Sequence, residues 1–182
     1  MDEITREEVH VRRIEMRGFK RSDGMYEVEA NLTDQKPFDF QPPSRDRPIR
    51  AGELIHDHVV RVVFSEDMVI REVLTTMRAW PYRECPGGGE SLFGMVGVLI
   101  GQGWASEVRK RLPNSETCTH MKELMNTLAS AAYQTIYSVR PFDGSEAAVD
   151  GRPRKIDSCY AYGASRELVL SYWPQFHRKE IE

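Results

Sequence analysis

The sequence places a thiol and an imidazole two residues apart in the run Cys118-Thr119-His120. Thr117 or Thr119 is a good N-cap for the apolar segment that follows, which predicts Cys118 and His120 at a helix N-terminus. Free N–H groups and the positive dipole end favour an anion there, so a thiol ionises more easily. Thiolate and imidazole are also good zinc or iron ligands. The alternative is that Cys118 extends the apolar face of the helix and His120 lies at the surface.

A second candidate cluster is His56-Asp57-His58. On a strand, His56 and His58 share a face while Asp57 points away. Two histidines on one face can bind a metal, and a nearby carboxylate can orient one ring. The alternative is a pair of surface histidines on an edge strand. The other histidines, His10 and His177, lie near the chain ends and look incidental.

Cys85 precedes a glycine-rich turn, Gly87-Gly88-Gly89, that could bend to present its thiol. The segment lacks the residues of a phosphatase loop or a Walker loop, and no Gly-x-Ser-x-Gly elbow occurs in the chain. Trp80, Tyr82 and Trp104 flank this segment and could wall a pocket for an aromatic or acyl ligand. The alternative is that these aromatic side chains belong to the core.

A proline-rich loop is predicted over residues 33–53, and it carries Arg45, Arg47 and Arg50. Arginines of this kind could receive an anionic group, and Arg50 is the candidate for a substrate carboxylate. The alternative is a loop that is merely solvated.

The composition describes a globular chain of 182 residues, with 40% hydrophobic and 29% charged residues. A net charge of −3 gives no basic field for nucleic acid or an anionic membrane. No apolar run approaches membrane-spanning length, and the charged start lacks the features of a signal peptide. Three widely spaced cysteines do not form a disulfide framework. We therefore expect a cytoplasmic protein with a small-molecule substrate, and whether it forms a homo-oligomer stays open.

Apolar alternation predicts the strands that position the first cluster. A hairpin with one solvent-exposed face is predicted over Val9–Arg17 and Tyr26–Leu32. Two more strands are predicted over His56–Phe64 and Met68–Met77. In the last of these strands, Ile70 faces one way and Val73 the other. Four antiparallel strands are the simplest assembly.

Helical spacing predicts the elements of the second half. A short apolar segment over Glu90–Ile100 precedes a short helix over Ala105–Leu112, and the longest helix begins near Thr117. Residues 141–156 are predicted as a loop, and Asp157–Tyr162 with Glu167–Tyr172 as a final hairpin. Strands followed by helices indicate an α+β fold, with the helices on one face of the sheet, in a single domain over residues 1–182.

The chain resembles the bacterial domain-of-unknown-function family numbered 2889. The resemblance rests on several runs: Asp34–Phe40, Ile49–Glu53, Ile55–Asp57, Cys85-Pro86, Val96-Gly97, Ile100-Gly101, Gly103-Trp104, Cys118–His120, Glu123-Leu124, Asp157–Cys159 and Trp173-Pro174. The usual form has Gly where this chain has Thr117, and Gly87-Gly88-Gly89 looks like an insertion. The resemblance implies that His56, Asp57, Cys118 and His120 matter, without giving a function.

A weaker resemblance concerns the order of the metal-binding residue types along the chain. His56 or Asp57, then Cys85, then Cys118-x-His120 is similar to the arrangement in scaffold proteins of iron–sulfur assembly. This likeness is one of arrangement and implies no function by itself.

These observations favour a small metal-dependent enzyme, a lyase or hydrolase. The predicted ligands of zinc or iron are His56, Cys85, Cys118 and His120. The catalytic candidates are Asp57, Cys118 and His120, and the substrate-binding candidates are Arg50, Tyr82 and Trp104. The alternatives are a metal or iron–sulfur carrier without turnover, a metal-free enzyme with Cys118 as nucleophile, and an assembly domain whose cysteines belong to the core.

Overall fold

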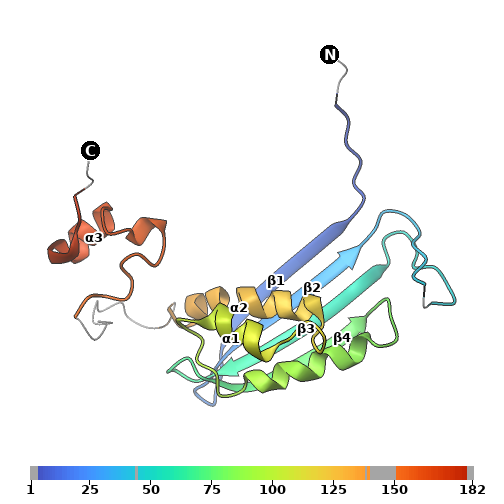
Figure 1. Ribbon diagram of the computed structural model, residues 1–182, viewed down its shortest axis with the longest axis horizontal. Coiled ribbons are helices and arrows are strands. Elements are labelled where there is room, and N and C mark those ends of the chain that lie inside the picture. Colours follow the sequence, from blue (N-terminus) through green and yellow to red (C-terminus); the bar gives the residue numbers. More distant parts are fainter. Residues whose placement is uncertain (1–3, 44, 138, 140–150, 180–182) are drawn as a thin grey trace. The chain divides into compact units, whose positions relative to one another are not determined.

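The computed structural model describes residues 4–43, 45–137, 139 and 151–179. The chain divides into two compact units, residues 1–139 and 140–182, where the sequence predicts one domain. The first unit has the predicted α+β fold, an antiparallel sheet with helices over one face (Figure 1). No helix among the described residues is long and apolar enough to cross a membrane.

The sheet is a four-stranded meander in which each strand pairs with the next one along the chain. Its strands are β1 (Val11–Lys20), β2 (Tyr26–Gln35), β3 (Leu54–Phe64) and β4 (Ile70–Ala79). The prediction of four antiparallel strands is confirmed. β2 extends three residues into the predicted loop, so residues 36–53 form the connection, which is tied by a bridge between Phe40 and Ile49.

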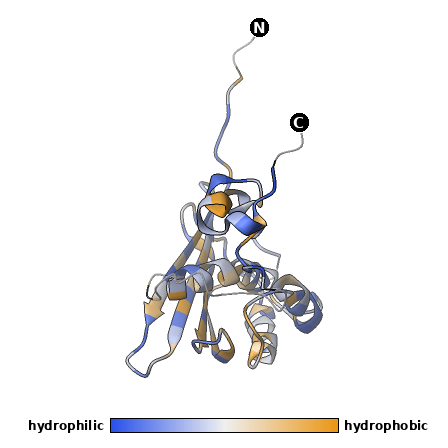
Figure 2. Cartoon of the chain, turned by 90° about the vertical axis from the view of Figure 1, so that its left-hand side faces the viewer, coloured by the Kyte–Doolittle hydropathy of each residue, from blue (hydrophilic) through white to orange (hydrophobic). Residues whose placement is uncertain are grey.

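The alternation along β2 fixes which face of the sheet is buried. Tyr26, Val28, Ala30 and Leu32 are buried, and the residues between them are partly exposed. Hydrophilic and hydrophobic residues accordingly alternate along the strands in Figure 2. The next position of the buried stripe is Asp34, which is 2% exposed. The core face of the sheet therefore ends in a buried carboxylate.

A β-bulge changes the predicted faces of β4. The register with β3 shifts at Val63/Phe64, which leaves Arg71 as the extra residue of the bulge. One extra residue reverses the alternation, so Ile70 and Val73 both belong to the buried core. The prediction that these two residues face opposite ways is wrong.

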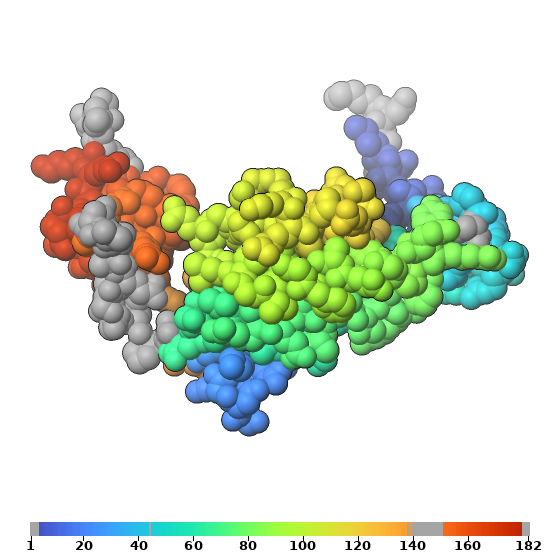
Figure 3. All heavy atoms as spheres, turned by 60° about the horizontal axis from the view of Figure 1, so that its bottom comes forward, coloured from blue at the N-terminus to red at the C-terminus, as the bar shows by residue number. Residues whose placement is uncertain are grey.

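Three helical elements pack on the core face: η1 (Cys85–Met95), α1 (Trp104–Arg111) and α2 (Thr119–Tyr137). The predicted apolar stripe of α2 is confirmed, and it lies against β1, β2 and β3. Gly18 permits this close approach, because a Cβ there would lie 1.9 Å from Thr135 Oγ1. In Figure 3, the green spheres of β4 and η1 form one continuous surface, in agreement with their mutual contacts.

The second unit is helical, and the predicted C-terminal hairpin is wrong. It contains η2 (Tyr160–Tyr162), α3 (Glu167–Tyr172) and η3 (Pro174–Phe176). The N–H groups of Leu170 and Trp173 donate to the carbonyls four residues earlier, those of Arg166 and Val169, which is the helical hydrogen-bond pattern. Residues 151–156 have no regular secondary structure, and the rest of the predicted 141–156 loop lies outside the described residues.

Candidate metal centre

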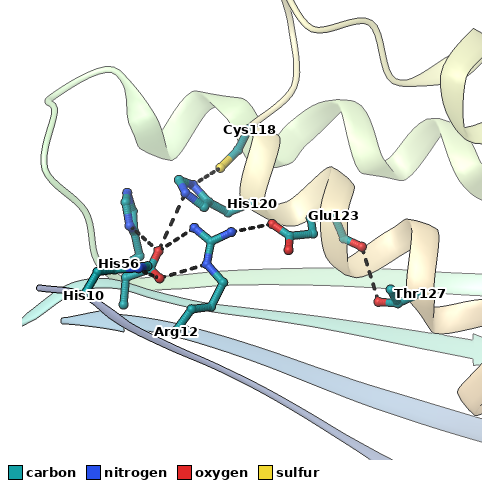
Figure 4. Close-up of polar contacts among 8 residues, drawn as sticks. His10, Arg12, His56, Cys118, His120, Glu123 and Thr127 are labelled. Carbon is teal, nitrogen blue, oxygen red and sulfur yellow. Dashed lines mark hydrogen bonds and ion pairs between the residues drawn. The ribbon is translucent and has the colours of Figure 1, made fainter. Parts of the chain in front are cut away.

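Polar side chains gather where the core face of the sheet meets the start of α2. Asp34 on β2 pairs with Arg12 on β1 and with His56 on β3. His58 lies two residues further along β3, and residues directly opposite or two apart on strands share a face. The first turn of α2 adds His120. Figure 4 shows Arg12 and His56 of the sheet and His120 of α2 pointing toward one another.

Three imidazoles form the centre of this cluster. His56, His58 and His120 each offer a ring nitrogen, and these nitrogens all lie within 4.8 Å of one another. The ring centroids of His56 and His120 are 3.9 Å apart, and those of His58 and His120 are 5.7 Å apart. Three nitrogens bound to one zinc ion at about 2.1 Å lie roughly 3.4 Å from each other. Small side-chain shifts would therefore bring the three rings to one ion.

The burial of the His58 ring is not explained by hydrogen bonds within the described part of the fold. Its exposure is 0%, and neither of its ring nitrogens has a hydrogen-bond partner among the described residues. A buried polar atom without a partner costs about 1–3 kcal/mol of stability. An apolar residue at this position would avoid that cost.

Asp34 organises the residues around it. Arg12 donates from Nε and Nη2 to the two carboxylate oxygens at 2.8 and 2.9 Å, and His10 Nε2 lies 2.9 Å from Oδ1. His56 Nδ1 lies 2.9 Å from Oδ2, and His120 Nε2 is 3.7 Å from the same oxygen. Burial alone would raise the pKa of Asp34, but Arg12, His10 and His56 together hold that pKa well below its usual range. The carboxylate is therefore ionised and fixes the His56 ring through Nδ1, so Nε2 is the nitrogen that could bind a metal ion.

The histidines of the cluster are neutral near pH 7. Burial, and after it the neighbouring His120, lowers the pKa of His56 to about 4, although the hydrogen bond to Asp34 opposes this shift. Burial, then His120, also lowers the pKa of His58 to about 4. The pKa of His120 is lowered by burial and by Arg12. Neutral imidazole is the form that binds a metal.

Cys118 lies beside the cluster at the entry to α2. Its carbonyl accepts the first hydrogen bond of the helix, from Lys122 N–H, so Cys118 itself precedes the first turn. Its Sγ is 3.8 Å from His120 Nδ1. Cys118 therefore occupies the N-cap position that the sequence assigns to Thr117 or Thr119, and Thr117 Oγ1 lies 2.9 Å from Ser91 Oγ.

Cys85, the fourth predicted ligand, is not part of the three-histidine group. It is partly buried at the start of η1. Burial raises the pKa of its thiol, and the neighbouring Cys118 and Glu84 raise it further. A thiol of this kind ionises less readily than an ordinary cysteine. Cys159 lies in the second unit.

Three predicted site residues make their contacts outside the histidine cluster. Asp57 is on the opposite face of β3 from the histidines, where Asn31 Nδ2 donates to its Oδ1 at 2.9 Å. Arg50 donates to Asp39 at 2.6 Å. Trp104 is a core residue whose Nε1 donates to the Met125 carbonyl at 2.9 Å.

Tyr82 is the predicted substrate-binding residue that does reach the cluster. It lines a cavity of about 300 Å³ that also touches His56 and His120. The cavity gives a small molecule access to the same imidazoles that could hold a metal. It also touches Asp34, so the site is open beside its fixed carboxylate.

Asp34, Arg12 and His10 are site residues that sequence reasoning missed. The expectation that His10 is incidental is wrong, because it contacts Asp34. A signal was present for Asp34, since it stands in phase with the buried positions of β2. A carboxylate in phase with a buried stripe needs partners, and here they come from β1, β3 and α2.

The fold and the site together define a class of α+β protein with a buried carboxylate and three clustered histidines at the sheet end. The chain belongs to the family described as Protein of unknown function (DUF2889), whose model matches residues 10–134. This span includes the whole cluster, and it excludes the tail runs at Asp157–Cys159 and Trp173-Pro174 that also resemble the family. Neither a curated protein nor a solved structure matches the chain.

Proposed function

We propose that this protein is a small metal-dependent enzyme whose ion is held by His56, His58 and His120. The observation that carries the proposal is His58, which is fully buried with two unpartnered ring nitrogens beside two other neutral imidazoles. The Asp34–His56 hydrogen bond is the carboxylate–histidine pair that commonly supports a metal ligand.

Zinc and iron both suit the donor set. Imidazole nitrogen is a good ligand for either metal, and the buried Asp34 would orient a ligand rather than bind the ion. Three protein ligands leave one coordination position for water or a substrate oxygen, which is the pattern of catalytic zinc sites. An ion so placed is a Lewis acid, which suits a hydrolase or lyase reaction.

The cavity favours an enzyme over a metal or iron–sulfur carrier. A carrier needs a closed shell of protein ligands, whereas here a cavity of about 300 Å³ touches His56 and His120. With three nitrogen donors grouped and Cys85 outside the group, the cluster is also poorer in thiolate than an iron–sulfur site. We place the activity in the cytoplasm, in keeping with the absence of a disulfide among the described cysteines.

A metal-free thiol enzyme is the second candidate. The 3.8 Å contact between Cys118 Sγ and His120 Nδ1 favours it, because a nucleophilic thiol needs an adjacent base. In this case His120 accepts the thiol proton.

Elemental analysis and metal titration of the purified protein test the proposal. We expect about one zinc or iron per chain in the wild type and at least a ten-fold loss of affinity in His58→Leu and His120→Ala. His177→Ala is the matched control, because His177 lies outside the family match and its ring contacts the Ser165 backbone carbonyl. Full metal content in His58→Leu would contradict the proposal.

Iodoacetamide separates the two candidates. If Cys118 is the nucleophile, wild-type protein without metal reacts rapidly at this thiol, and His120→Ala slows the reaction. If the metal centre is correct, Cys118→Ser retains the ion, and added zinc or iron protects His120 from chemical modification.

A further inference from the structure

The cavity beside the histidines has both apolar and polar walls, and the charged residues that line it are Arg12, Asp34 and Lys36. Phe40, Ile55, Pro81 and Tyr82 line it, and His56 and His120 lie at the same cavity. A volume of about 300 Å³ is at the small end for ligand sites, which fits a single-ring molecule better than a nucleotide.

Two basic side chains, Arg12 and Lys36, line the cavity, and the charge of Arg12 is already neutralised by carboxylates. Arg12 bonds both oxygens of Asp34, and its Nη1 donates to Glu123 Oε2 at 2.6 Å. These two carboxylates satisfy the guanidinium, so Arg12 has little capacity left for a ligand.

Lys36 is the cation that remains available. It lines the cavity and is partly buried, and its ammonium group lies near two aromatic rings. Nζ lies 5.2 Å from the Phe38 ring centroid and 5.6 Å from that of Phe40. No carboxylate among the described residues pairs with it. A lysine beside this cavity, next to imidazoles held neutral, leaves a positive centre for an anion.

Resting on the proposed function, we propose that Lys36 is a specificity-determining residue that binds the carboxylate of a small aromatic acid. The ring of the substrate packs between Phe40 and Tyr82, and its reacting end faces His56 and His120. The aromatic rings next to Nζ hold the ammonium group at the cavity wall. Lys36 thus takes the role that the sequence suggests for Arg50, which Asp39 already occupies.

Calorimetric titration with benzoate and benzamide tests this inference on the full chain. The two probes have the same ring and nearly the same shape, and they differ in charge. We expect the wild type to bind benzoate at least ten-fold more tightly than benzamide and ten-fold more tightly than acetate. Lys36→Met should lose the preference over benzamide, while Lys36→Arg, which keeps the charge, should retain most of it. Lys110→Met, which removes an exposed lysine of α1, is the matched control and should behave as the wild type.

The titrations are run on both cobalt-loaded and metal-free protein. Cobalt uptake is followed by its absorption spectrum, so its failure overturns the proposed metal centre and leaves the Lys36 comparison readable in metal-free protein. Equal affinity for benzoate and benzamide in the wild type overturns the inference. A preference that survives in Lys36→Met, or benzoate binding no tighter than acetate, also overturns it.

Discussion

His58 stands on β3 in the position of a core residue. It continues the buried stripe of Val60, Val62 and Phe64, all of which are 0% exposed. Imidazole is costly there, because neither ring nitrogen has a partner among the described residues. The cost suggests a residue kept for binding rather than for folding.

The first prediction follows from this conflict between folding and binding. We expect His58→Leu to raise the free energy of unfolding of the metal-free protein by about 1–2 kcal/mol, because it removes buried unpaired nitrogens. The same change should abolish metal binding. Urea unfolding of chelator-treated wild type and variant measures the first effect, and metal titration measures the second. A clearly destabilised variant would indicate that the His58 nitrogens are satisfied in the folded protein.

The stability of the metal-free protein should depend on pH through His56 and His58. Both have a pKa of about 4 in the folded protein, against an ordinary value of about 6.5. Between these values the unfolded chain binds more protons, so stability is full above pH 6.5 and declines as the pH falls towards 4. The loss from fully buried His58 is roughly 3 kcal/mol. Urea unfolding at several pH values should give a shallower decline in His58→Leu than in the wild type, and parallel profiles would contradict the assignment.

The sequence identifies site residues only where their types stand out locally. Cys118-x-His120 and His56-x-His58 are recognisable as short patterns, and the structure groups their three histidines. Asp34 and Arg12 become site residues only through strand pairing, since they are 22 residues apart and meet across β1 and β2. Their roles therefore could not be read from neighbouring residues alone.

At the scale of elements, the site depends on how η1 meets the start of α2. The Cys118 N–H donates to the Gly88 carbonyl at 2.8 Å. A Cβ on Gly88 would lie 2.8 Å from Cys118 N and 3.0 Å from Cys118 Cβ. The glycine run that looks like an insertion thus lets the two segments touch, and this contact sets the position of the first turn that carries His120.

We expect Gly88→Ala to displace the start of α2 and weaken metal binding at least ten-fold. Overpacking of this kind costs about 1–3 kcal/mol, so the thermal midpoint should fall as well. Gly87→Ala is the matched control, because a Cβ there meets nothing within 4 Å. Metal titration and thermal unfolding of the two variants give the comparison. Equal metal affinity in both variants would show that this contact does not position the site.

Period-two and helical patterns predicted the main elements of the first unit. They did not predict the bulge in β4 or the helical state of a short apolar segment near the C-terminus. The bulge at Arg71 inserts one residue that no turn or glycine signal marks in the sequence. The reversal of the alternation along β4 therefore could not be predicted. The segment Glu167–Tyr172 is apolar enough for a strand, and the hydrogen bond from Leu170 N–H to the Arg166 carbonyl shows that it is a helix. Short apolar runs carry this ambiguity in general.

At the scale of the whole chain, the two units have separate hydrophobic cores. The core of the first unit joins the sheet to η1, α1 and α2. The second core consists of Ile156, Ala164, Val169 and Trp173, with Tyr162 and Phe176 against it. The family match over residues 10–134 falls within the first unit, as does the whole histidine cluster.

The last prediction is that a chain ending at residue 139 folds cooperatively and keeps the metal site. Every residue proposed to hold or orient the ion lies before that point, and so does the core that supports them. We expect one sharp thermal transition and a metal affinity within about three-fold of the full chain, since a factor of three is below 1 kcal/mol. His58→Leu in the shortened chain should again abolish binding, which ties the retained ion to the same site. If the shortened chain folds but has lost the ion, residues 140–182 contribute to the centre and the three-histidine assignment is incomplete.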